Sequence, residues 1–509
     1  MNKYMEKFGE KMENLNQLLA VKKQKLEKLK DLGVDPYPTR SFRTHKIKVL
    51  IDNKDDFISS EEVVTITGRL KTMRRQGKVG FGNITDDSGN LQIFVKKDTV
   101  GEENYEIYKL LDLGDFVQIK GVCFNTQRGE FSLRAHVVTV LGKSLLPLPT
   151  VKEKIVDGKK QRFDEFTDIE LRYRKRYLDL LLNPEVKKNF EIRAQIIKEI
   201  RSFLDEKEFM EVETPILQPL YGGANARPFV THHNTLNVDL YMRIALELYH
   251  KRLIVGGIER VFEIGKNFRN EGMDRTHNPE FSMLELYQAY ADYNDMMDLT
   301  EDMVVHIAKK VNNKEAVTFG DTEISFQKPW RRASMIDLVK EESGFDAADF
   351  DFEKIKSFCE EQGIDVENTA GPGKLIEALF EKFVEPKLVQ PTFVIDFPKE
   401  ISPLAKVKPG HPNLTERFEL FINGNEYGNA FTELNDPIDQ RQRLEAQSKL
   451  REMGDVEANV VDEDFLEALE YGMPPTGGLG IGIDRLVMLF TNNTSIKEVI
   501  FFPQMKPEE

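Results

Sequence analysis

The sequence predicts an α+β protein in which a small β-barrel precedes a larger domain of mixed helices and strands. Its 509 residues exceed what one hydrophobic core usually holds, so we expect roughly two to four domains. Residues 63–141 consist of short alternating strands, whereas helical and extended patterns mix from residue 170 onward. Forty per cent of the residues are hydrophobic, which allows sizeable cores and excludes general disorder.

The net charge and the number of cysteines exclude several kinds of function and of stabilising site for this protein. Lys and Arg number 71 against 86 Asp and Glu, and the net charge of −15 argues against a protein that coats nucleic acid non-specifically. The negative net charge does not exclude a local strip of basic residues on the surface of an acidic protein. Two cysteines, Cys123 and Cys359, cannot form a disulfide framework or a four-ligand zinc site. Because the sequence has neither a signal peptide nor an apolar run near the roughly 20 residues that cross a bilayer, we expect a cytoplasmic protein with no membrane contact.

Residues 1–55 form the predicted N-terminal helical segment. Within it, residues 10–32 carry a loose apolar stripe of 3.6-residue period among charged residues, which favours a solvated helix that packs by one face. The stripe consists of Leu15, Leu18, Leu19, Val21, Leu26, Leu29 and Leu32. Gly33 ends this helix, and Asp35-Pro36 turns the chain away.

Residues 56–147 form the predicted barrel domain. Its short strands alternate in polarity, are separated by turn signals such as Asp87-Ser88-Gly89-Asn90, and lie at 64–73, 80–86, 91–95, 115–124 and 130–141. Five short strands in about 80 residues fit an OB-fold, a small barrel that often binds single-stranded nucleic acid. Residues 148–180 are charged and poor in apolar side chains, which indicates a linker.

Residues 181–509 form the predicted larger domain. A helix starts after Asn183-Pro184, with an apolar face made of Phe190, Ile196, Ile197, Ile200, Phe203 and Leu204. A strand at 210–217 follows, and Pro215 confines it to a sheet edge or a strand end because proline has no N–H. Residues 333–390 return to an acidic helical pattern, which we interpret as a helical insertion.

Two glycine-containing segments fail the tests for common phosphate-binding loops. Gly142-Lys143-Ser144 resembles the end of a P-loop, but the first glycine of that motif would fall on Val137. The glycine run at 477–482 lacks a glycine at 483, lies at the far C-terminal end and enters a helix that begins with Asp484-Arg485, whereas a dinucleotide fingerprint needs a following unit with an acidic residue about 20 positions on. This run is also compatible with a structural role, in which it lets a helix and a sheet approach closely.

The segment 261–290 predicts two antiparallel strands joined by a polar loop. In the second strand, side chains two residues apart share a face, so one face carries Phe281, Met283, Glu285 and Tyr287. Leu284 and Leu286 point the other way, into a core. A purely structural strand rarely places an acid and a phenol beside a large aromatic ring, although a solvated sheet face with incidental charges is the alternative.

The segment 416–436 predicts a hairpin around Asn423-Gly424, a strong signal for a two-residue turn. In this register Glu419 and Glu426 lie diagonally on one face, and two such close carboxylates fit a hard divalent cation such as Mg²⁺ with bound phosphates. Asn429, Phe431 and Glu433 are out of phase with Glu426. For all five to face one ligand, the ladder must slip by one residue, so we predict a β-bulge near Tyr427-Gly428.

Three of these segments together resemble the signature motifs of the class II aminoacyl-tRNA synthetases. The helix at 184–209 together with residues 212–217 resembles the first motif. Residues 268–281 resemble the second motif, and residues 478–490 resemble the third. No class I signature of the HIGH or KMSKS type occurs. Within the class, the barrel and residues 222–234, 417–421 and 432–436 resemble bacterial lysyl-tRNA synthetases. The resemblance covers nearly the whole chain.

The resemblance implies a fold, a reaction and a set of site residues. It implies an antiparallel sheet flanked by helices, an anticodon-binding OB-fold domain, a homodimer formed through the first motif, and formation of lysyl-tRNA(Lys) from ATP, L-lysine and tRNA(Lys). The implied ATP contacts are Arg269, which is also the catalytic residue, Glu271, His277, Asn278, Phe281, Glu419 and Arg485. The implied lysine contacts are Gly223, Glu247, Arg269, Glu285, Tyr287, Asn429, Phe431 and Glu433. The implied Mg²⁺ ligands are Glu419 and Glu426.

A basic strip in the barrel fits the implied tRNA partner. Residues 69–78 hold five basic residues and no acid, and Phe81 adds a stacking surface on the next strand, a pattern expected of an OB-fold that binds single-stranded bases. A solvated strand face is the alternative interpretation. The resemblance assigns anticodon contacts to Arg74, Phe81, Gln92 and Glu130.

Three rival functions share parts of this pattern. Aspartyl- and asparaginyl-tRNA synthetases have the same architecture, but their pockets need groups that bind a carboxylate or amide, whereas the candidates here are glutamates. A related ligase that lysylates a translation factor lacks the barrel. A non-catalytic paralogue would be expected to lack Arg269, Arg485 or the metal-binding acids, all of which are present. One departure from the lysyl family is Leu246, where proline is usual.

Overall fold

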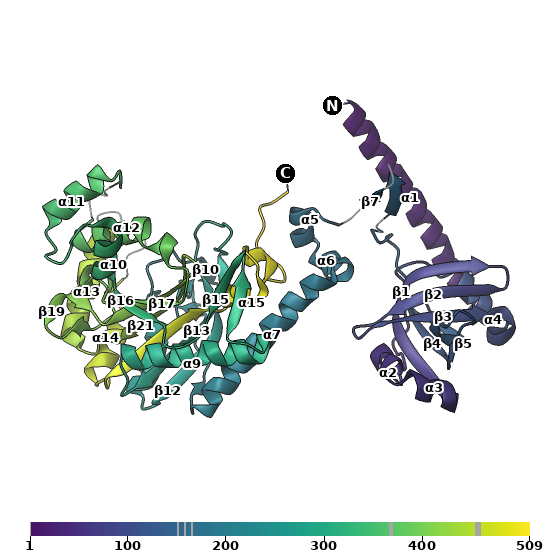
Figure 1. The fold of residues 1–509 in the computed structure, drawn as a ribbon, viewed down its shortest axis with the longest axis horizontal. Helices are drawn as coiled ribbons and strands as arrows, with labels where there is room; N and C mark the ends of the chain where they lie inside the picture. The colour runs from purple at the N-terminus through teal and green to yellow at the C-terminus, as the bar shows by residue number, and fades with distance from the viewer. Residues whose placement is uncertain are drawn as a thin grey trace. The chain divides into compact units, whose positions relative to one another are not determined.

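The computed structural model describes residues 2–149, 152–156, 159–163, 166–365, 370–452 and 460–508. The chain divides into two compact units, Met1–Phe166 and Thr167–Glu509 (Figure 1). The predicted α+β class is confirmed, because a closed barrel lies in the first unit and a large sheet with helices lies in the second. Among the described residues, no helix combines the length and apolar character needed to cross a membrane.

The first unit contains the predicted five-stranded barrel, closed in the order β1-β2-β3-β5-β4 (Figure 1). Its strands are β1 (Val63–Gln76), β2 (Val79–Thr85), β3 (Asn90–Lys96), β4 (Phe116–Asn125) and β5 (Phe131–Gly142). Alternate side chains of these strands fill one core, as their alternating pattern predicts. The other elements of this unit are α1 (Asn2–Asp31), α2 (Ile47–Asp52), α3 (Lys54–Ser60), α4 (Lys97–Lys109), β6 (Lys152–Val156) and β7 (Lys159–Phe163).

The helix α1 begins earlier than predicted and packs through fewer of its stripe residues. Leu29 is fully buried, but Leu15, Leu18, Val21 and Leu32 are exposed, so the stripe is not a continuous packing face. Polar contacts also hold α1 on the barrel. The Lys22 ammonium donates to the Ser144 carbonyl at 2.9 Å, Lys25 pairs with Asp112 at 2.5 Å, and the buried Lys143 pairs with both Asp112 and Asp115 at 2.6 Å. Hydrophobic periodicity cannot reveal such polar anchors.

In the described part of the second unit, eight strands form one sheet in the order β16-β17-β20-β21-β22-β13-β12-β8. The five central pairings are antiparallel, and the two edge pairings are parallel. The strands are β8 (Met210–Glu211), β12 (Arg260–Phe268), β13 (Glu280–Ala289), β16 (Arg331–Ser334), β17 (Thr392–Ile395), β20 (Arg417–Ile422), β21 (Asn425–Thr432) and β22 (Thr476–Gly482). The predicted pairing of the two strands in 261–290 is confirmed as β12 with β13.

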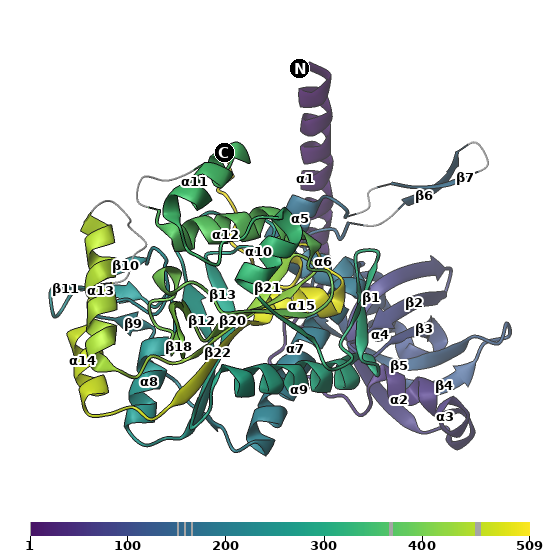
Figure 2. The same ribbon diagram turned by 60° about the vertical axis from the view of Figure 1, so that its left-hand side comes forward.

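One face of this sheet packs against the helices α7 (Pro184–Glu206), α9 (Tyr293–Asn312) and α15 (Ile483–Thr491) (Figures 1 and 2). Leu284 and Leu286 point into this core, as the alternation of β13 predicts. Helix α7 begins at Pro184 and buries its predicted face, with Ile197 only half-buried. The opposite face of the central strands is left for the polar side chains described below.

Proline divides the segment that was predicted to be one strand at 210–217. It forms β8, which is an edge strand as expected, and the short β9 (Leu217–Gln218), with Pro215 between them. In the gap, the backbone N–H of Thr214 donates to the Glu263 carboxylate at 2.9 Å instead of joining a ladder. The strand β9 joins β10 (Val230–His233) and β11 (Val238–Met242) in a separate small sheet.

The helical pattern in 333–390 is confirmed as α10 (Met335–Ser343), α11 (Phe352–Glu361) and α12 (Pro372–Phe383), which share their own core (Figure 1). Another group joins α8 (Glu247–Val255) to α14 (Glu463–Glu470), with α13 (Pro437–Glu452) packed on α14 (Figure 2). The second unit begins with α5 (Ile169–Arg174) and α6 (Arg176–Leu182), so the last part of the range 148–180 that was interpreted as linker is helical, and α6 continues past it. The remaining strands are β14 (Ala316–Phe319), β15 (Thr322–Ser325), β18 (Val407–Lys408) and β19 (His411–Thr415).

Candidate active site

The predicted β-bulge exists, and it aligns the side chains of β21. Asn425 pairs with Ile422 and Glu426 with Phe421, but the next pairing along the ladder joins Gly428 to Leu420. Tyr427 is therefore the extra residue, and its side chain lies in the hydrophobic core. Because of this slip, Glu426 and Asn429 both face the open side of the sheet, where both line cavities.

Two adjoining cavities lie on that open face. Cavity 1 has a volume of about 250 Å³ and cavity 2 about 320 Å³, and both are lined by Arg269, Met283, Glu426, Asn429 and Gly480. Every residue that the resemblance assigned to ATP, lysine or Mg²⁺ lines one or both. Cavity 1 has Arg269, Glu271, His277, Asn278, Phe281, Glu426, Asn429 and Arg485, and cavity 2 has Gly223, Glu247, Arg269, Glu285, Tyr287, Glu419, Glu426, Asn429, Phe431 and Glu433.

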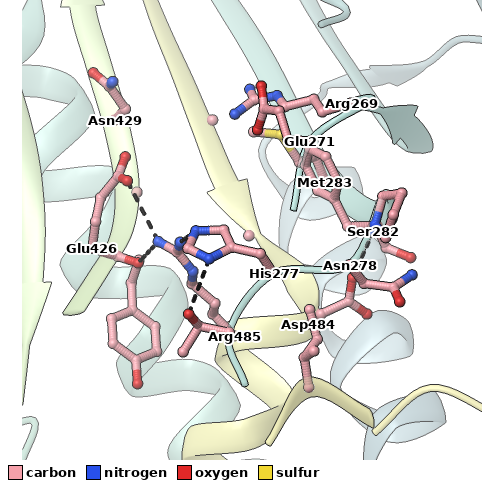
Figure 3. Close-up of a pocket in the computed structure, with 18 of the residues that line it drawn as sticks. Arg269, Glu271, His277, Asn278, Ser282, Met283, Glu426, Asn429, Asp484 and Arg485 are labelled. Atoms are coloured by element: carbon pink, nitrogen blue, oxygen red, sulfur yellow. Dashed lines mark hydrogen bonds and ion pairs between the residues drawn. The ribbon is translucent and has the colours of Figure 1, made fainter. Parts of the chain in front are cut away.

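Cavity 1 presents two guanidinium groups (Figure 3). Arg269 follows β12, lies with its guanidinium carbon 5.2 Å from the centroid of the Phe281 ring, and has a buried Nε without a hydrogen-bond partner. Arg485, near the start of α15, donates to the Glu426 carbonyl at 2.6 Å and lies 3.2 Å from Nε2 of His277. A guanidinium with a buried, unused donor is a suitable group for binding an anion.

Cavity 2 concentrates buried carboxylates. Glu247, Glu285 and Glu433 are each at most 5 % exposed. Burial raises the pKa of Glu285, and burial with the charges of Glu247 and Glu285 raises the pKa of Glu433 to about 8 despite the lowering effect of a nearby lysine. An acid-lined cavity of this kind stabilises a cationic guest, because a cation restores the favoured ionised state of each carboxylate.

Glu285 is held by two hydrogen bonds. The Tyr287 hydroxyl donates to its Oε2 at 3.2 Å, and the backbone N–H of Leu246 donates to its Oε1 at 3.1 Å. Proline, the usual residue of the family at position 246, has no N–H and cannot make the second bond. Leucine at position 246 therefore gives the Glu285 carboxylate a backbone hydrogen bond that proline could not provide.

Glu419 and Glu426 are the candidate cation ligands. Burial and the negative charge of Glu426 raise the pKa of Glu419 to about 8, although Arg417 pairs with it at 2.5 Å. A divalent cation between the two would remove this repulsion, and carboxylate oxygens are suitable ligands for Mg²⁺. Among the described residues no group of three or more His, Cys, Asp or Glu side chains is arranged to hold a metal, so these two acids need further oxygen ligands from a substrate or water.

Sequence reasoning missed two charged residues, one that lines cavity 2 and one that lies behind its acidic side chains. Lys251 is fully buried and pairs with Glu247 and Glu433, and Arg417 lines the cavity and pairs with Glu419. Both had a signal in the sequence. Lys251 lies four residues after Glu247 on one helix, and Arg417 lies two residues before Glu419 on one strand, so each pair shares a face.

The glycine run 477–482 forms β22 and gives room to both faces of the sheet. A Cβ on Gly477 would lie 3.0 Å from Met296 in α9, which agrees with close helix–sheet packing. A Cβ on Gly478 would lie 2.0 Å from Oε1 of Glu433 and 2.6 Å from the Tyr287 ring. This strand therefore forms the floor over which the acidic side chains of cavity 2 extend.

Replacing Gly478 by alanine is expected to displace Glu433 and raise the concentration of the cavity 2 ligand needed for half-saturation by about tenfold or more. Gly482→Ala is the matched control, because Gly482 does not line cavity 2 and a Cβ there would meet only the Arg485 side chain, at 3.8 Å. Titration of both variants with L-lysine, the ligand that the sequence resemblance implies for this cavity, measures the two affinities. Equal affinities in the two variants would contradict the role given to Gly478.

In the barrel, the residues assigned to the anticodon lie on neighbouring strands. Arg74 on β1 pairs with Phe81 on β2, which pairs with Phe94 on β3, and the rings of Phe81 and Phe94 are 5.0 Å apart. Gln92 donates to the Ser132 hydroxyl at 2.8 Å, and Glu130 is exposed two residues before that serine. Phe94 and Phe124, whose rings are 5.7 Å apart, extend the aromatic surface and were not predicted, although Phe94 is two residues from Gln92.

Comparison with known proteins places this geometry in a family. Residues 168–506 match the family described as tRNA synthetases class II (D, K and N), and residues 64–141 match the OB-fold nucleic acid binding domain. Three curated relatives are each named lysine–tRNA ligase. The chain is 52 % identical to the relative from Streptococcus pneumoniae and 49 % identical to that from Carboxydothermus hydrogenoformans, with 98 % of this chain and 99 % of each relative covered. It is 49 % identical to the relative from Bacillus subtilis, with 97 % and 98 % covered. The chain therefore belongs to the class II lysyl-tRNA synthetase family.

Proposed function

We propose that this chain activates L-lysine with ATP, forming lysyl-adenylate and pyrophosphate, and then transfers the lysyl group to the 3′ end of tRNA(Lys). The observation that carries the proposal is the adjacency of a cavity lined by three buried glutamates to a cavity with two arginines. Such glutamates favour an amine-ended substrate. They disfavour aspartate by like charge, and asparagine or methionine because buried carboxylates would stay unpaired.

The first step joins two anions. The lysine carboxylate is already ionised at neutral pH, so its oxygen attacks the α-phosphorus without a general base, and the bond to the pyrophosphate oxygen breaks. Arg269, which lines both cavities, is assigned to the α-phosphate and the lysine carboxylate together. In the second step a ribose hydroxyl attacks the lysyl carbonyl, AMP leaves, and the hydroxyl proton is lost.

The side chains of cavity 2 are assigned to the groups of lysine. Glu285, Glu433 and the Tyr287 hydroxyl bind the ε-ammonium group. The α-ammonium group is bound by Glu247, whose position at the start of α8 is supported by a close approach, since a Cβ on Gly223 would be 3.2 Å from its Cβ. The Gly223 backbone, Asn429 and Phe431 complete the pocket, with Asn429 at the lysine carboxylate.

The side chains of cavity 1 are assigned to ATP. Phe281 and Arg485 take the two faces of adenine, combining stacking with a cation–π interaction. Glu271 and Asn278 contact the adenosine side, and His277 contacts the terminal phosphates. Glu419 and Glu426 would hold Mg²⁺, which would supply positive charge against the phosphates. The raised pKa of Glu419 supports this, because a cation between the two acids would favour its ionised form.

Exchange of labelled pyrophosphate into ATP tests the activation step. We expect exchange with lysine and none with aspartate or asparagine at equal concentrations. Aminoacylation of tRNA(Lys) by the same preparation then tests the second step. Exchange that depends on aspartate or asparagine, or that ignores the amino acid supplied, would refute the proposal.

The proposed anticodon surface predicts an effect confined to the tRNA step. Phe81→Ala is expected to lower kcat/KM for tRNA(Lys) by about tenfold to a hundredfold, since stacking of one base on an aromatic ring contributes about 1–3 kcal/mol. Lysine-dependent exchange needs no tRNA and should not change. Phe42, which is exposed and lies outside the strands of the barrel, provides the control Phe42→Ala. Equal losses in the two variants would contradict the assignment.

We also propose that the chain acts as a cytoplasmic homodimer formed through its first motif. Apolar side chains exposed on the short strands after α7 support a covered surface there, namely those of Met210, Leu217, Val230 and Val238. A sedimentation experiment should give a mass near twice 58.7 kDa. A monomer at micromolar concentration would refute the dimer.

A further inference from the structure

Lys251 is a fully buried cation that lines neither cavity 1 nor cavity 2. Its ammonium Nζ lies 2.5 Å from Oε1 of Glu247 and 2.5 Å from Oε2 of Glu433, two acids that come from different elements. Lys251 and Glu247 are on α8, whereas Glu433 follows β21. Burial alone would lower the pKa of Lys251, but the two carboxylates outweigh it and raise the pKa above the ordinary value, so this ammonium stays protonated.

The groups that face Lys251 define a charge balance. Its direct neighbours are Glu247 on α8, Glu433 after β21 and the uncharged Phe465 ring on α14, 5.9 Å from Nζ. The charges of Glu247 and Glu433 also act on Glu285 of β13, which accepts from the Tyr287 hydroxyl, and the Tyr287 ring lies 5.4 Å from that of His250. His250 in turn lies 3.3 Å from Glu263 of β12, which is also paired with Arg243. With Glu247, Glu285 and Glu433 ionised and Lys251 protonated, these four side chains together carry two uncompensated negative charges.

Lysine carries two ammonium groups and one carboxylate at neutral pH. Its carboxylate is assigned to Arg269, which leaves two positive charges for cavity 2. We propose that Lys251 is a specificity-determining positioning residue, which neutralises one of the three glutamates so that the loaded cavity matches the two ammonium groups of lysine. It acts through Glu247 and Glu433 rather than by touching the substrate. This inference rests on the proposed function.

A structural tie between α8 and β21 is the competing role, and the two roles predict different measurements. A tie would affect stability and, by distortion, every substrate at every pH. A charge-balancing role predicts that loss of the ammonium raises the pKa of the neighbouring acids further, so that one keeps its proton when lysine binds. Lysine binding then recovers as the pH rises and that acid ionises.

The test is the KM for lysine in pyrophosphate exchange between pH 7 and 9, for the wild type, Lys251→Met and Lys251→Gln. At pH 7 we expect a KM about 10- to 100-fold above wild type, since one pKa unit changes the ionised fraction about tenfold. The ratio of variant to wild-type KM should fall toward pH 9, whereas the KM for ATP and kcat at saturating lysine change far less. The ionisation of the free lysine substrate between pH 7 and 9 is the same in both assays, so its effect cancels in the ratio of the two KM values.

Lys143→Met is the matched control. Lys143 is equally buried and pairs with two carboxylates, Asp112 and Asp115, but it lies in the first unit. Its loss should lower stability without changing the KM for lysine at any pH. The inference would be overturned if the ratio of the Lys251→Met KM to the wild-type KM stayed constant from pH 7 to 9, or if the variant had the wild-type KM for lysine. Neither result would affect the proposed function, which depends on lysine-dependent exchange by the wild type.

Should neither Lys251 variant fold, proton release by the wild type decides. Burial and the charges of Glu247 and Glu285 raise the pKa of Glu433 in the free protein, so an acid of this cluster that ionises in the complex releases its proton when lysine binds. Calorimetry of lysine binding in buffers of different ionisation enthalpy measures that release. About one proton or more supports the charge balance, and none overturns it, because an acid that remained neutral would need no counter-charge.

Discussion

Replacing Arg269 by alanine is expected to lower the rate of lysine-dependent pyrophosphate exchange by about 10²–10³-fold or more. Arg269 lines both cavities, and its buried Nε has no hydrogen-bond partner in the protein. In the proposed reaction this guanidinium faces both the attacking carboxylate and the α-phosphate, where negative charge accumulates. Loss of one preorganised donor in such a site costs about 3–4 kcal/mol of transition-state stabilisation. Rapid-quench or steady-state exchange at saturating ATP and lysine measures the loss.

Arg269→Lys separates charge from geometry. It keeps one positive charge but cannot bind two oxygen atoms with a planar fork, so we expect it to recover only part of the rate. Arg252→Ala is a suitable control for removing an arginine from the same domain, because that side chain pairs with Asp462 away from both cavities. The two Arg269 variants should keep the oligomeric mass of the wild type, and their thermal unfolding midpoints should lie within a few degrees of its midpoint. Wild-type exchange by Arg269→Ala would refute its assigned role.

Replacing Glu433 by glutamine is expected to raise the KM for lysine by about 10²–10³-fold and to leave the KM for ATP nearly unchanged. Glu433 is 1 % exposed, faces Lys251, and is assigned to the ε-ammonium group of the substrate. The amide removes a charge from a buried ion pair, and breaking one partner of such a pair costs about 3–5 kcal/mol. Titration of lysine in the exchange assay gives the two KM values.

Glu280→Gln is the control for this experiment. Glu280 lies at the start of β13, is exposed, and is 3.6 Å from Lys266 at the surface. Its replacement should leave both KM values as in the wild type, because exposed ion pairs contribute little. A KM for lysine that rises equally in both variants would contradict the placement of the ε-ammonium group in cavity 2.

Much of this site followed from strand periodicity. The alternation of β13 predicted that Glu285 and Tyr287 share a face while Leu284 and Leu286 enter the core, and both expectations are confirmed. The bulge at Tyr427 also followed, because only a slip of one residue lets Glu426 face the same side as Asn429. Local backbone rules were sufficient here, since each inference needed only two neighbouring strands.

The charged supports of the site did not follow from such rules. Whether Lys251 points into solvent or toward Glu433 depends on how α8 packs against the end of β21. These two elements are distant in the sequence, because 178 positions separate Val255, the last residue of α8, from Glu433. The stripe on α1 failed for a similar reason, because Lys22 and Lys25 bind the barrel where Leu18 and Val21 do not. Periodicity ranks apolar faces but does not weigh them against distant polar partners.

A structure of the protein with L-lysine and a non-hydrolysable ATP analogue tests the central claim most directly. The account predicts the ε-nitrogen of lysine within hydrogen-bond distance of Glu433 and Glu285, the adenine between Phe281 and Arg485, and the Arg269 guanidinium between the lysine carboxylate and the α-phosphate. A lysine side chain bound outside cavity 2, or an α-phosphate beyond the reach of Arg269, would contradict it.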